Sequence, residues 1–379
     1  MPWKEVSAMS QRQEFVRLAQ GKGTNIRELC RRFGVSPTTG YKWLRRFRDG
    51  DMSGLVDLPR RPHYSPERTP LQVERIVLAA RDTHPAWGAR KLRAWLLADG
   101  HERLPSPSTI MAILQRRGRI DPTEGLKHRT WQRFEHQAPN QLWQMDFKGH
   151  FALGEGRCHP LTVLDDHSRF ALGLEACSDE TTETVRQRLT AIFRRYGLPD
   201  RIVMDNGSPW GYDDDHHHTP LTVWLLRLDI AVSHGRPYHP QTQGKDERFH
   251  RTLKAEVLQG RSFADLAQCQ KAFARWRSIY NLERPHQALG MATPASRYQL
   301  SHRSFPETLP PVEYGPDDLV RRVGDKGRIS VHGRLFKVGK AFKGLPVAIR
   351  PAAEDGSYNV FFRTHNIAQI DYRHRDQHT

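Results

Sequence analysis

The sequence predicts a multidomain chain, with all-α modules at its N-terminus, an α/β core with a mixed sheet, and a small β domain at its C-terminus. Three observations predict this fold class. The chain has 379 residues, and chains of this length usually fold into several domains with separate hydrophobic cores. Apolar residues recur at helical spacing before residue 120, and strands alternate with helices from about residue 140. Beyond residue 300 the pattern is strand-like. We expect domains at 1–60, 61–130, 131–300 and 301–379.

Composition excludes several classes of protein. Hydrophobic residues make up 37% of the chain and mean hydropathy is −0.71, and no run of about 18 apolar residues predicts a membrane span. The N-terminus lacks the apolar segment of a secretion signal. The four cysteines are scattered without a CxxC pair, which argues against a zinc or disulfide framework. We therefore expect a protein of the reducing cytoplasm with no membrane partner.

Charge is concentrated at one end of the chain. The net charge is +17, and residues 1–130 hold 25 basic and 13 acidic residues, a net of +12. Residues 131–300 hold 21 and 20, a net of +1, and residues 301–379 hold 13 and 9, a net of +4. A basic module beside a near-neutral one is typical of a polyanion-binding segment attached to a separate functional core. We expect nucleic acid as a partner.

Residues 25–50 have the pattern of a helix-turn-helix. Asn25 and Glu28 begin a helix with apolar residues at i, i+3, i+4 and i+7, and Gly34 ends it. Ser36 caps a second helix with Pro37 at its first position. Such a helix enters the DNA major groove while its cations contact phosphates. A plain helical hairpin is the alternative. The residues predicted to contact DNA are Thr38, Thr39, Lys42, Arg45 and Arg46.

A second basic helical module is predicted after a linker, 58–66, that is rich in proline and arginine. Helices are expected near 67–82, 88–99 and 107–117, because Gly100 stops the middle helix and Ser106 starts the last. The module would extend the DNA contact. Both a winged helix and a plain spacer bundle fit the pattern.

The core and the tail follow from strand and turn signals. Core strands are predicted at 141–147, 161–164, 169–175, 201–204 and 230–233, and helices at 181–196, 219–228 and 242–258. This order predicts a mixed sheet flanked by helices. In the tail, strands near 329–331, 347–350 and 358–362, with an Asp355-Gly356 hairpin signal, predict a small basic β-barrel.

Three carboxylates stand where two-metal chemistry needs them. Asp146 lies on the first core strand, on the face opposite the most apolar one. Asp205 follows the fourth strand, at the edge where open sheets hold ligands. Glu247 lies one turn into the last core helix, on a face shared with His250 and apart from the buried stripe. Carboxylates on rigid elements suit Mg²⁺, and two such ions about 4 Å apart activate one oxygen and stabilise another.

Composition alone does not single out these three among 42 acidic residues. The sequence Asp205-Asn206-Gly207 also suits a tight turn, and Glu247 also suits a solvated helix face. Asp165 and Asp166 are rival carboxylates, which we interpret as turn formers between two strands.

Three ordered motifs decide between these alternatives. They are WQMDF at 143–147, VMDNG at 203–207 and YHPQTQGKDER at 238–248. Together they resemble the integrase core of bacterial insertion-sequence transposases, the DDE group related to retroviral integrases. The match covers roughly residues 130–300, and the order of modules along the whole chain is similar to that of the same family.

The resemblance implies an RNase H-like fold and a catalytic, metal-binding triad of Asp146, Asp205 and Glu247. It implies two Mg²⁺ ions as cofactors, with Mn²⁺ as a substitute. It also implies DNA contacts by Lys245 and Arg248, and Arg251 joins them because it shares a helix face with Glu247. Ordinary helix solvation is the alternative for these cations.

The sequence departs from the family pattern in three places. The 41 residues between Asp205 and Glu247 exceed the usual mid-thirties spacing. The surplus falls in 209–220, whose Asp/His run at 213–218 we interpret as a surface loop rather than a metal site. The His-His-Cys-Cys zinc module of retroviral integrases is missing from the sequence, and so is a GxxxxGK[ST] motif. An accessory ATPase partner therefore stays open.

The resemblance implies a transposase that acts on the ends of its own mobile element. The helix-turn-helix would read the terminal inverted repeat of double-stranded DNA. The core would free a 3′-OH at the element's end, and that 3′-OH would attack target DNA. A homo-oligomer on DNA in the bacterial cytoplasm, at the nucleoid, is implied. Two alternatives stay open: a catalytically inactive, sequence-specific DNA-binding repressor, and an RNase H-like nuclease that cuts without joining.

Overall fold

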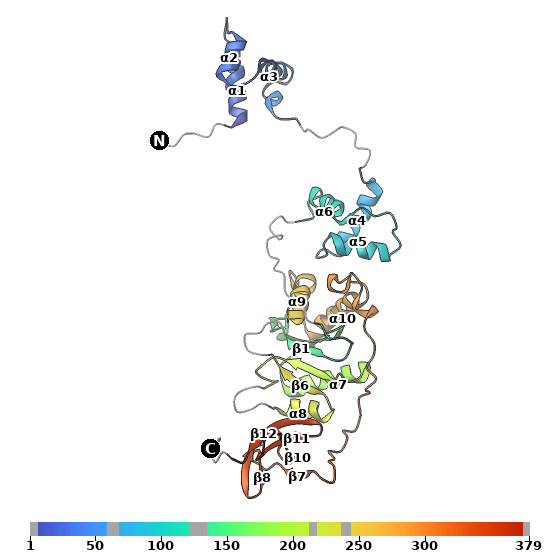
Figure 1. Cartoon of the computed structure of the whole chain (residues 1–379). Coiled ribbons are helices and arrows are strands. Elements are labelled where there is room, and N and C mark those ends of the chain that lie inside the picture. Colours follow the sequence, from blue (N-terminus) through green and yellow to red (C-terminus); the bar gives the residue numbers. More distant parts are fainter. Residues whose placement is uncertain (1–6, 59–67, 121–134, 212–217, 236–243, 374–379) are drawn as a thin grey trace. The chain divides into compact units, whose positions relative to one another are not determined.

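A computed structural model describes residues 7–58, 68–120, 135–211, 218–235 and 244–373. The chain divides into two compact units, Met1–Arg68 and Thr69–Thr379, which are treated separately below (Figure 1). The linker predicted at 58–66 and the Asp/His run at 213–218 fall almost entirely outside the described residues. No helix within the described ranges is long and apolar enough to cross a membrane.

The first unit is a helical domain that contains the predicted helix-turn-helix. Helices α1 (Ala8–Ala19), α2 (Ile26–Arg32) and α3 (Pro37–Gly50) precede a short 3₁₀ helix, Asp51–Leu55. The predicted caps are confirmed, because Asn25 accepts from the backbone of Arg27 and Glu28, and Ser36 accepts from that of Thr39. Helix α1 was not predicted. It packs Phe15 and Val16 against the turn and completes the core with Leu29, Cys30, Trp43 and Leu55.

The second unit begins with three helices, α4 (Leu71–Thr83), α5 (Ala89–Ala98) and α6 (Pro107–Arg116), near their predicted positions. Their core contains Val77, Trp87, Leu92 and Ile110. Glu74 is buried between Arg116 and Arg117, at 2.6 and 2.9 Å. Within residues 68–120 the structure has no strand, so the wing that the sequence left open is not seen there.

The core is one mixed sheet. Its strands are β1 (Trp143–Phe147), β2 (Phe151–Ala152), β3 (Arg157–Asp165), β4 (Ala171–Cys177), β5 (Arg201–Met204) and β6 (Ala231–His234). The order is β2-β3-β1-β5-β6, with β4 paired to β3. Strand β1 is antiparallel to β3 and parallel to β5, and β5 is parallel to β6. The mixed sheet predicted from the strand order is therefore confirmed, and β1 lies at its centre.

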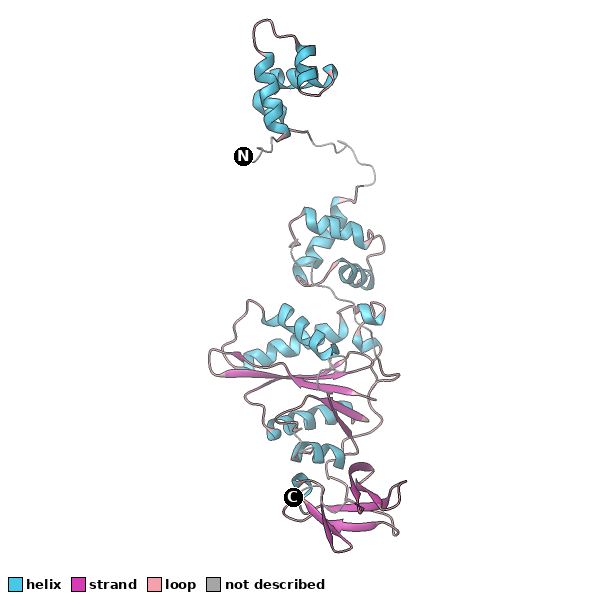
Figure 2. Ribbon diagram, turned by 60° about the vertical axis from the view of Figure 1, so that its left-hand side comes forward, coloured by secondary structure: helices cyan, strands magenta, loops and turns pink. Residues whose placement is uncertain are grey.

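Helices cover both faces of this sheet (Figure 2). Helices α7 (Thr182–Tyr196) and α8 (Pro220–Arg227) share one apolar cluster with Trp143 and Met145 of β1. Helices α9 (Gly244–Leu253) and α10 (Leu266–Leu282) belong to a second apolar cluster, which includes Leu164 of β3 and Leu174 of β4. A π-helical turn, Lys254–Leu258, continues α9, and 3₁₀ turns lie at Gln287–Leu289 and Pro294–Ser296. The predicted long helix is thus two segments of different winding.

The tail is a β domain with two antiparallel sheets. One has the order β12-β11-β10-β7 and the other pairs β8 with β9. The strands are β7 (Leu319–Arg322), β8 (Arg328–Val331), β9 (Arg334–Lys337), β10 (Pro346–Pro351), β11 (Ser357–Phe362) and β12 (His365–Asp371), with a 3₁₀ turn at Lys340–Phe342. Their core includes Val223 and Leu226 of α8. No pairing among the described strands closes a barrel, so the β domain is confirmed and the barrel is not.

Candidate active site

Two of the predicted carboxylates are placed by adjacent parallel strands: Asp146 lies on β1, and Asp205 directly follows β5. Asp146 is on β1, on the face opposite the buried Trp143 and Met145, and its side chain is 26% exposed. The β1–β5 register pairs Gln144 with Val203, and each of the two acids comes two residues after its member of that pair, so both lie toward the same edge of the sheet. Asp205 itself is exposed. Burial and the charge of Asp205 raise the pKa of Asp146 to about 7.

The third predicted carboxylate, Glu247, is exposed in the first turn of α9. The structure gathers a different group around Asp146: the possible ligand atoms of Asp146, Asp246 and His250 all lie within 4.8 Å of one another. Sequence reasoning missed Asp246 and His250 as members of this site. The signal was available, because residues four apart on a helix share a face. The placement of His250 beside Glu247 on the outer face is wrong, since His250 turns toward β1.

Thr162 of β3 connects these groups. It pairs with Asp146 in the β1–β3 register, and its Oγ lies 3.0 Å from the backbone oxygen of Asp146. The same Oγ lies 3.2 Å from Oδ1 of Asp246 and 2.9 Å from Nε2 of His250. Burial, and then the charge of Asp146, raise the pKa of Asp246 well above its ordinary value. Burial and the charge of Lys148 lower the pKa of His250 to about 4.

Lys245, a predicted DNA contact, forms an ion pair inside the protein. Its ammonium group binds the carboxylate of Asp166, which is 2% exposed. Asp166 also accepts from Nε2 of Gln144 at 2.8 Å and from the backbone of His136 at 2.9 Å. Although burial alone would raise the pKa of Asp166, the hydrogen bond and charge of Lys245 hold it below its ordinary value. This pair fixes the start of α9 to the loop that follows β3.

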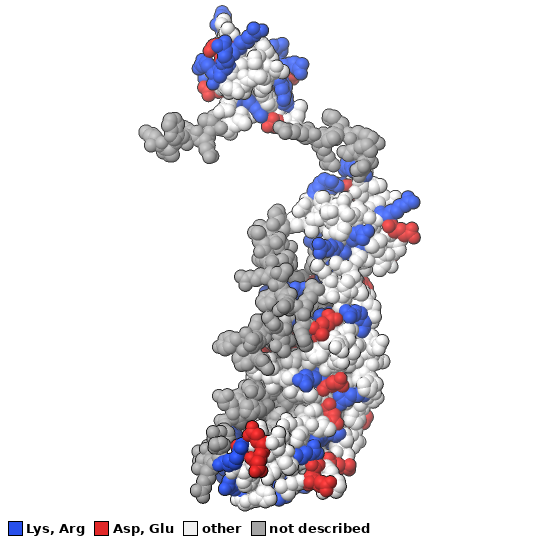
Figure 3. Space-filling view, in the orientation of Figure 1, with Lys and Arg blue, Asp and Glu red and all other residues white. Residues whose placement is uncertain are grey.

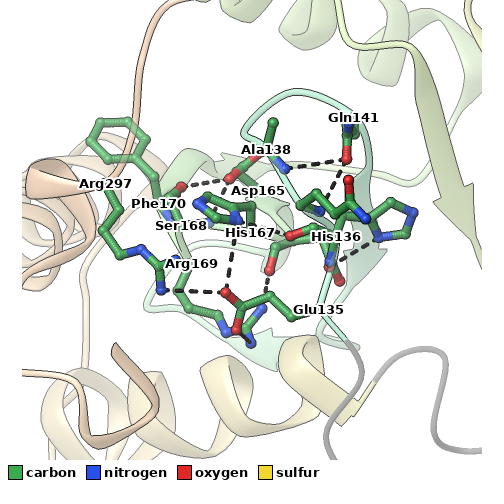
Figure 4. Close-up of polar contacts among 12 residues, drawn as sticks. Glu135, His136, Ala138, Gln141, Asp165, His167, Ser168, Arg169, Phe170 and Arg297 are labelled. Carbon is green, nitrogen blue, oxygen red and sulfur yellow. Dashed lines mark hydrogen bonds and ion pairs between the residues drawn. The ribbon is translucent and has the colours of Figure 1, made fainter. Parts of the chain in front are cut away.

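That loop is held by a polar network (Figure 4). Asp165 accepts from the backbone of Ser168 and of Asn140, each at 2.7 Å, which confirms it as a turn former. Glu135 pairs with Arg169 at 3.2 Å and Arg297 at 3.3 Å. The rival carboxylates Asp165 and Asp166 are therefore both saturated with partners inside the protein, and neither belongs to the group around Asp146.

The predicted DNA-reading helix presents its cations at the surface of the first unit. Thr38, Lys42 and Arg45 are exposed, whereas Thr39 and Arg46 are partly buried. Arg46 donates to the backbone of Val56 at 3.3 Å and lies over the ring of Trp43. Lys and Arg side chains spread over the visible face of this unit in Figure 3. In the core, Arg248 and Arg251 are exposed on α9. These positions are compatible with DNA contact.

Family models match most of the chain in consecutive pieces. Integrase core domains match residues 136–240 and 228–294, and the C-terminal domain of IS481 family transposases matches 318–378. A helix-turn-helix domain matches 11–63, and a homeodomain-like domain matches 39–114. The resemblance to insertion-sequence transposases is confirmed. The N-terminal DNA-binding domains and the integrase core thus follow one another in the order that the sequence predicted.

Individual relatives are distant. The chain is 26% identical over 242 residues to an uncharacterised 31.7 kDa protein of insertion element IS407 from Burkholderia multivorans, covering 61% of this chain and 83% of that protein. It is 29% identical to a 39.2 kDa protein of IS476 from Xanthomonas euvesicatoria, covering 41% of this chain and 44% of that protein. Among solved structures, the HTLV-2 integrase catalytic core in complex with magnesium aligns at 17% identity, over 43% of this chain and 99% of that chain, with a TM-score of 0.32.

Proposed function

We propose that this chain is a DNA transposase that binds the terminal inverted repeats of its mobile element, cleaves at the 3′ ends and joins them to target DNA. It would act as a polynucleotidyl transferase with Asp146, Asp205 and Glu247 as the metal-binding, catalytic triad. The observation that carries the proposal is a pair of electrostatically interacting carboxylates, one on β1 and one directly after the adjacent β5, within a stretch that matches integrase core domains.

The residues present suit divalent cations. Burial, and then the charge of the nearby Asp205, raise the pKa of Asp146 to about 7. A cation between two such carboxylates would relieve their repulsion, and oxygen ligands on rigid strands suit Mg²⁺, with Mn²⁺ as a substitute. Glu247 offers a third carboxylate from the exposed first turn of α9. When bound, two such ions would activate the attacking oxygen and stabilise the leaving one.

The chain's other residues would bind and position DNA. Helix α3 would read base edges through Thr38 and Thr39, while Lys42 and Arg45 contact phosphates. In the core, Arg248 and Arg251 would contact the backbone of the DNA end from the exposed side of α9. Two ends have to be joined in one reaction, so we place a homo-oligomer on double-stranded DNA, in the bacterial cytoplasm at the nucleoid.

The test separates binding from cleavage. Asp205→Asn keeps the shape of the side chain and removes a carboxylate, so cleavage of end-containing DNA should fall to background while end binding stays near wild type. Asp200→Asn is the matched control, since Asp200 is an exposed acid immediately before the same strand. Cleavage by Asp205→Asn at the wild-type rate would refute the triad. Wild-type products cut but never joined would favour a nuclease instead.

A further inference from the structure

The carboxylate of Asp246 is buried without full hydrogen bonding. The residue is 1% exposed, and its Oδ2 has no hydrogen-bond partner among the described residues. Within the same ranges, neither Asp246 nor Asp146 has a Lys or Arg within ion-pair distance, and each has His250 as its basic neighbour. Buried carboxylates normally have charged or hydrogen-bonding partners, because an unpaired one is costly. The negative charge at this site is therefore not balanced by any Lys or Arg of the described residues, and a bound cation would balance it.

His250 presents a free lone pair to the same place. Thr162 Oγ has one proton and lies near two acceptors, the backbone oxygen of Asp146 and Oδ1 of Asp246, so it donates to one of them. It therefore accepts from Nε2 of His250, 2.9 Å away. In the neutral imidazole, Nδ1 then carries the lone pair, and it faces Oδ2 of Asp146 at 4.0 Å. Two acceptors face each other across a gap too wide for a hydrogen bond.

The surroundings keep His250 in this ligating form. Burial and the charge of Lys148, which directly follows β1, lower the pKa of His250 to about 4, so the ring is neutral near pH 7. Nδ1 of His250, the ring nitrogen with the lone pair, is 4.0 Å from Oδ2 of Asp146, and one possible ligand atom from each of the three residues lies within 4.8 Å of the others. Ligand atoms on one ion with bonds of about 2.1 Å lie roughly 3 to 3.5 Å apart, so small side-chain rotations would close the group.

We propose that Asp146, Asp246 and His250 bind one divalent transition-metal ion, of the Mn²⁺ or Zn²⁺ class, at the junction of β1 and α9. An imidazole nitrogen beside carboxylates suits these ions better than Mg²⁺, which prefers oxygen and water. The site shares Asp146 with the proposed triad, and its relevance to catalysis rests on the proposed function. It ties the first turn of α9, which carries Glu247, to the central strand.

The test uses Mn²⁺ itself as the probe and electron paramagnetic resonance as the readout. The full chain, without an affinity tag, is stripped with EDTA and titrated with MnCl₂. Bound Mn²⁺ should show the nitrogen coupling of a directly bound imidazole. His250→Gln should abolish that coupling, and Asp246→Asn should weaken the binding of this ion at least about tenfold. Excess Mg²⁺ should displace it poorly. Wild-type Mn²⁺ bound without nitrogen coupling would overturn the proposal.

Matched controls address other histidines and misfolding. His302→Gln changes an exposed histidine and should keep the coupling. A variant with His216→Ala, His217→Ala and His218→Ala removes the histidines of the Asp/His run, and loss of the signal there rather than in His250→Gln would overturn the assignment. Thermal unfolding in EDTA and in MnCl₂ checks folding. Asp246→Asn should unfold cooperatively in EDTA. Mn²⁺ should raise the Tm of the wild type, and most of that rise should be lost in Asp246→Asn.

The two proposals fail separately. Metal-dependent cleavage and joining by a wild-type protein whose Mn²⁺ lacks nitrogen coupling would overturn this site and leave the transposase standing. Nitrogen coupling in a protein whose Asp205→Asn variant cleaves at the wild-type rate would keep this site and refute the triad.

Discussion

Replacing Lys245 by alanine should destabilise the core rather than simply weaken DNA binding. The ammonium group of Lys245 is the cationic partner of Asp166, and their side chains are 16% and 2% exposed. Breaking a buried ion pair by removing one partner costs about 3–5 kcal/mol, because the other charge stays buried. Asp166 keeps its hydrogen bonds from Gln144 and His136, which offset part of that loss. We therefore expect the lower end, about 3 kcal/mol.

The assay is thermal and denaturant unfolding of the full chain. For a large domain, about 2 °C of Tm is lost per kcal/mol, so Lys245→Ala should lower the Tm of the core transition by about 6 °C. Arg251→Ala is the matched control on the same helix, since Arg251 is exposed and should change stability by less than about 0.5 kcal/mol. DNA binding should respond in the opposite way. Arg251→Ala should reduce the slope of log binding constant against log salt concentration (the salt slope) by about one unit, and Lys245→Ala should leave this slope unchanged.

A double-mutant cycle identifies the partner. Combining Lys245→Ala with Asp166→Asn should cost less than the sum of the two single changes, because each removes the same pair. The reasoning fails if Lys245→Ala has the Tm of the wild type but a lower DNA affinity and a reduced salt slope. Lys245 would then be the DNA contact that the sequence motif implied.

Three further predictions concern packing, pH and DNA. Gly40→Ala should destabilise the first unit by about 1–3 kcal/mol in denaturant unfolding, because the added Cβ would collide with Sγ of the buried Cys30. Gly50→Ala should be near neutral, because its added Cβ would lie 3.6 Å from the nearest atom, Oγ of Ser53. In EDTA, the raised pKa of Asp146, about 7 when folded against about 3.9 unfolded, stabilises the fold at low pH and ceases to do so as the pH rises through 7. Wild type should therefore lose stability relative to Asp146→Asn between pH 4 and 7, and parallel pH profiles would contradict this. Arg45→Ala should weaken end binding and lower the salt slope by about one unit in filter-binding titrations, and an unchanged slope would remove Arg45 from the phosphate contacts.

Local signals predicted most of the helices and strands. The caps Asn25 and Ser36, and Gly197 with φ of 80° after α7, set helix ends through short-range hydrogen bonding and backbone freedom. Helix α1 escaped prediction because only Phe15 and Val16 of its side chains are fully buried, which leaves a weak apolar period. In the tail, β7, β9 and β12 are half-exposed and alternate weakly, so pairing with neighbouring strands decides them.

Sequence position predicts where part of the candidate site lies in the fold. Asp146 and Asp205 follow from strand position, because parallel neighbours end at one edge of the sheet. The positions of Asp246, His250 and Lys245 depend on how α9 docks on β1 and β3, and helical spacing gives the faces of a helix without saying which one docks. The partner of Lys245 lies 79 residues away in sequence, in a turn with no local sign that it holds a buried charge.

The central claim is best tested by a reaction in vitro. The full chain is incubated with DNA that carries the element's candidate ends, in Mg²⁺, in Mn²⁺ or in EDTA, and both nicked and joined products are resolved. We predict metal-dependent nicking at the end followed by joined product, both lost in EDTA and in Asp205→Asn. Tight, sequence-specific end binding with no cleavage in either metal would contradict the account and identify a DNA-binding repressor with an inactive core.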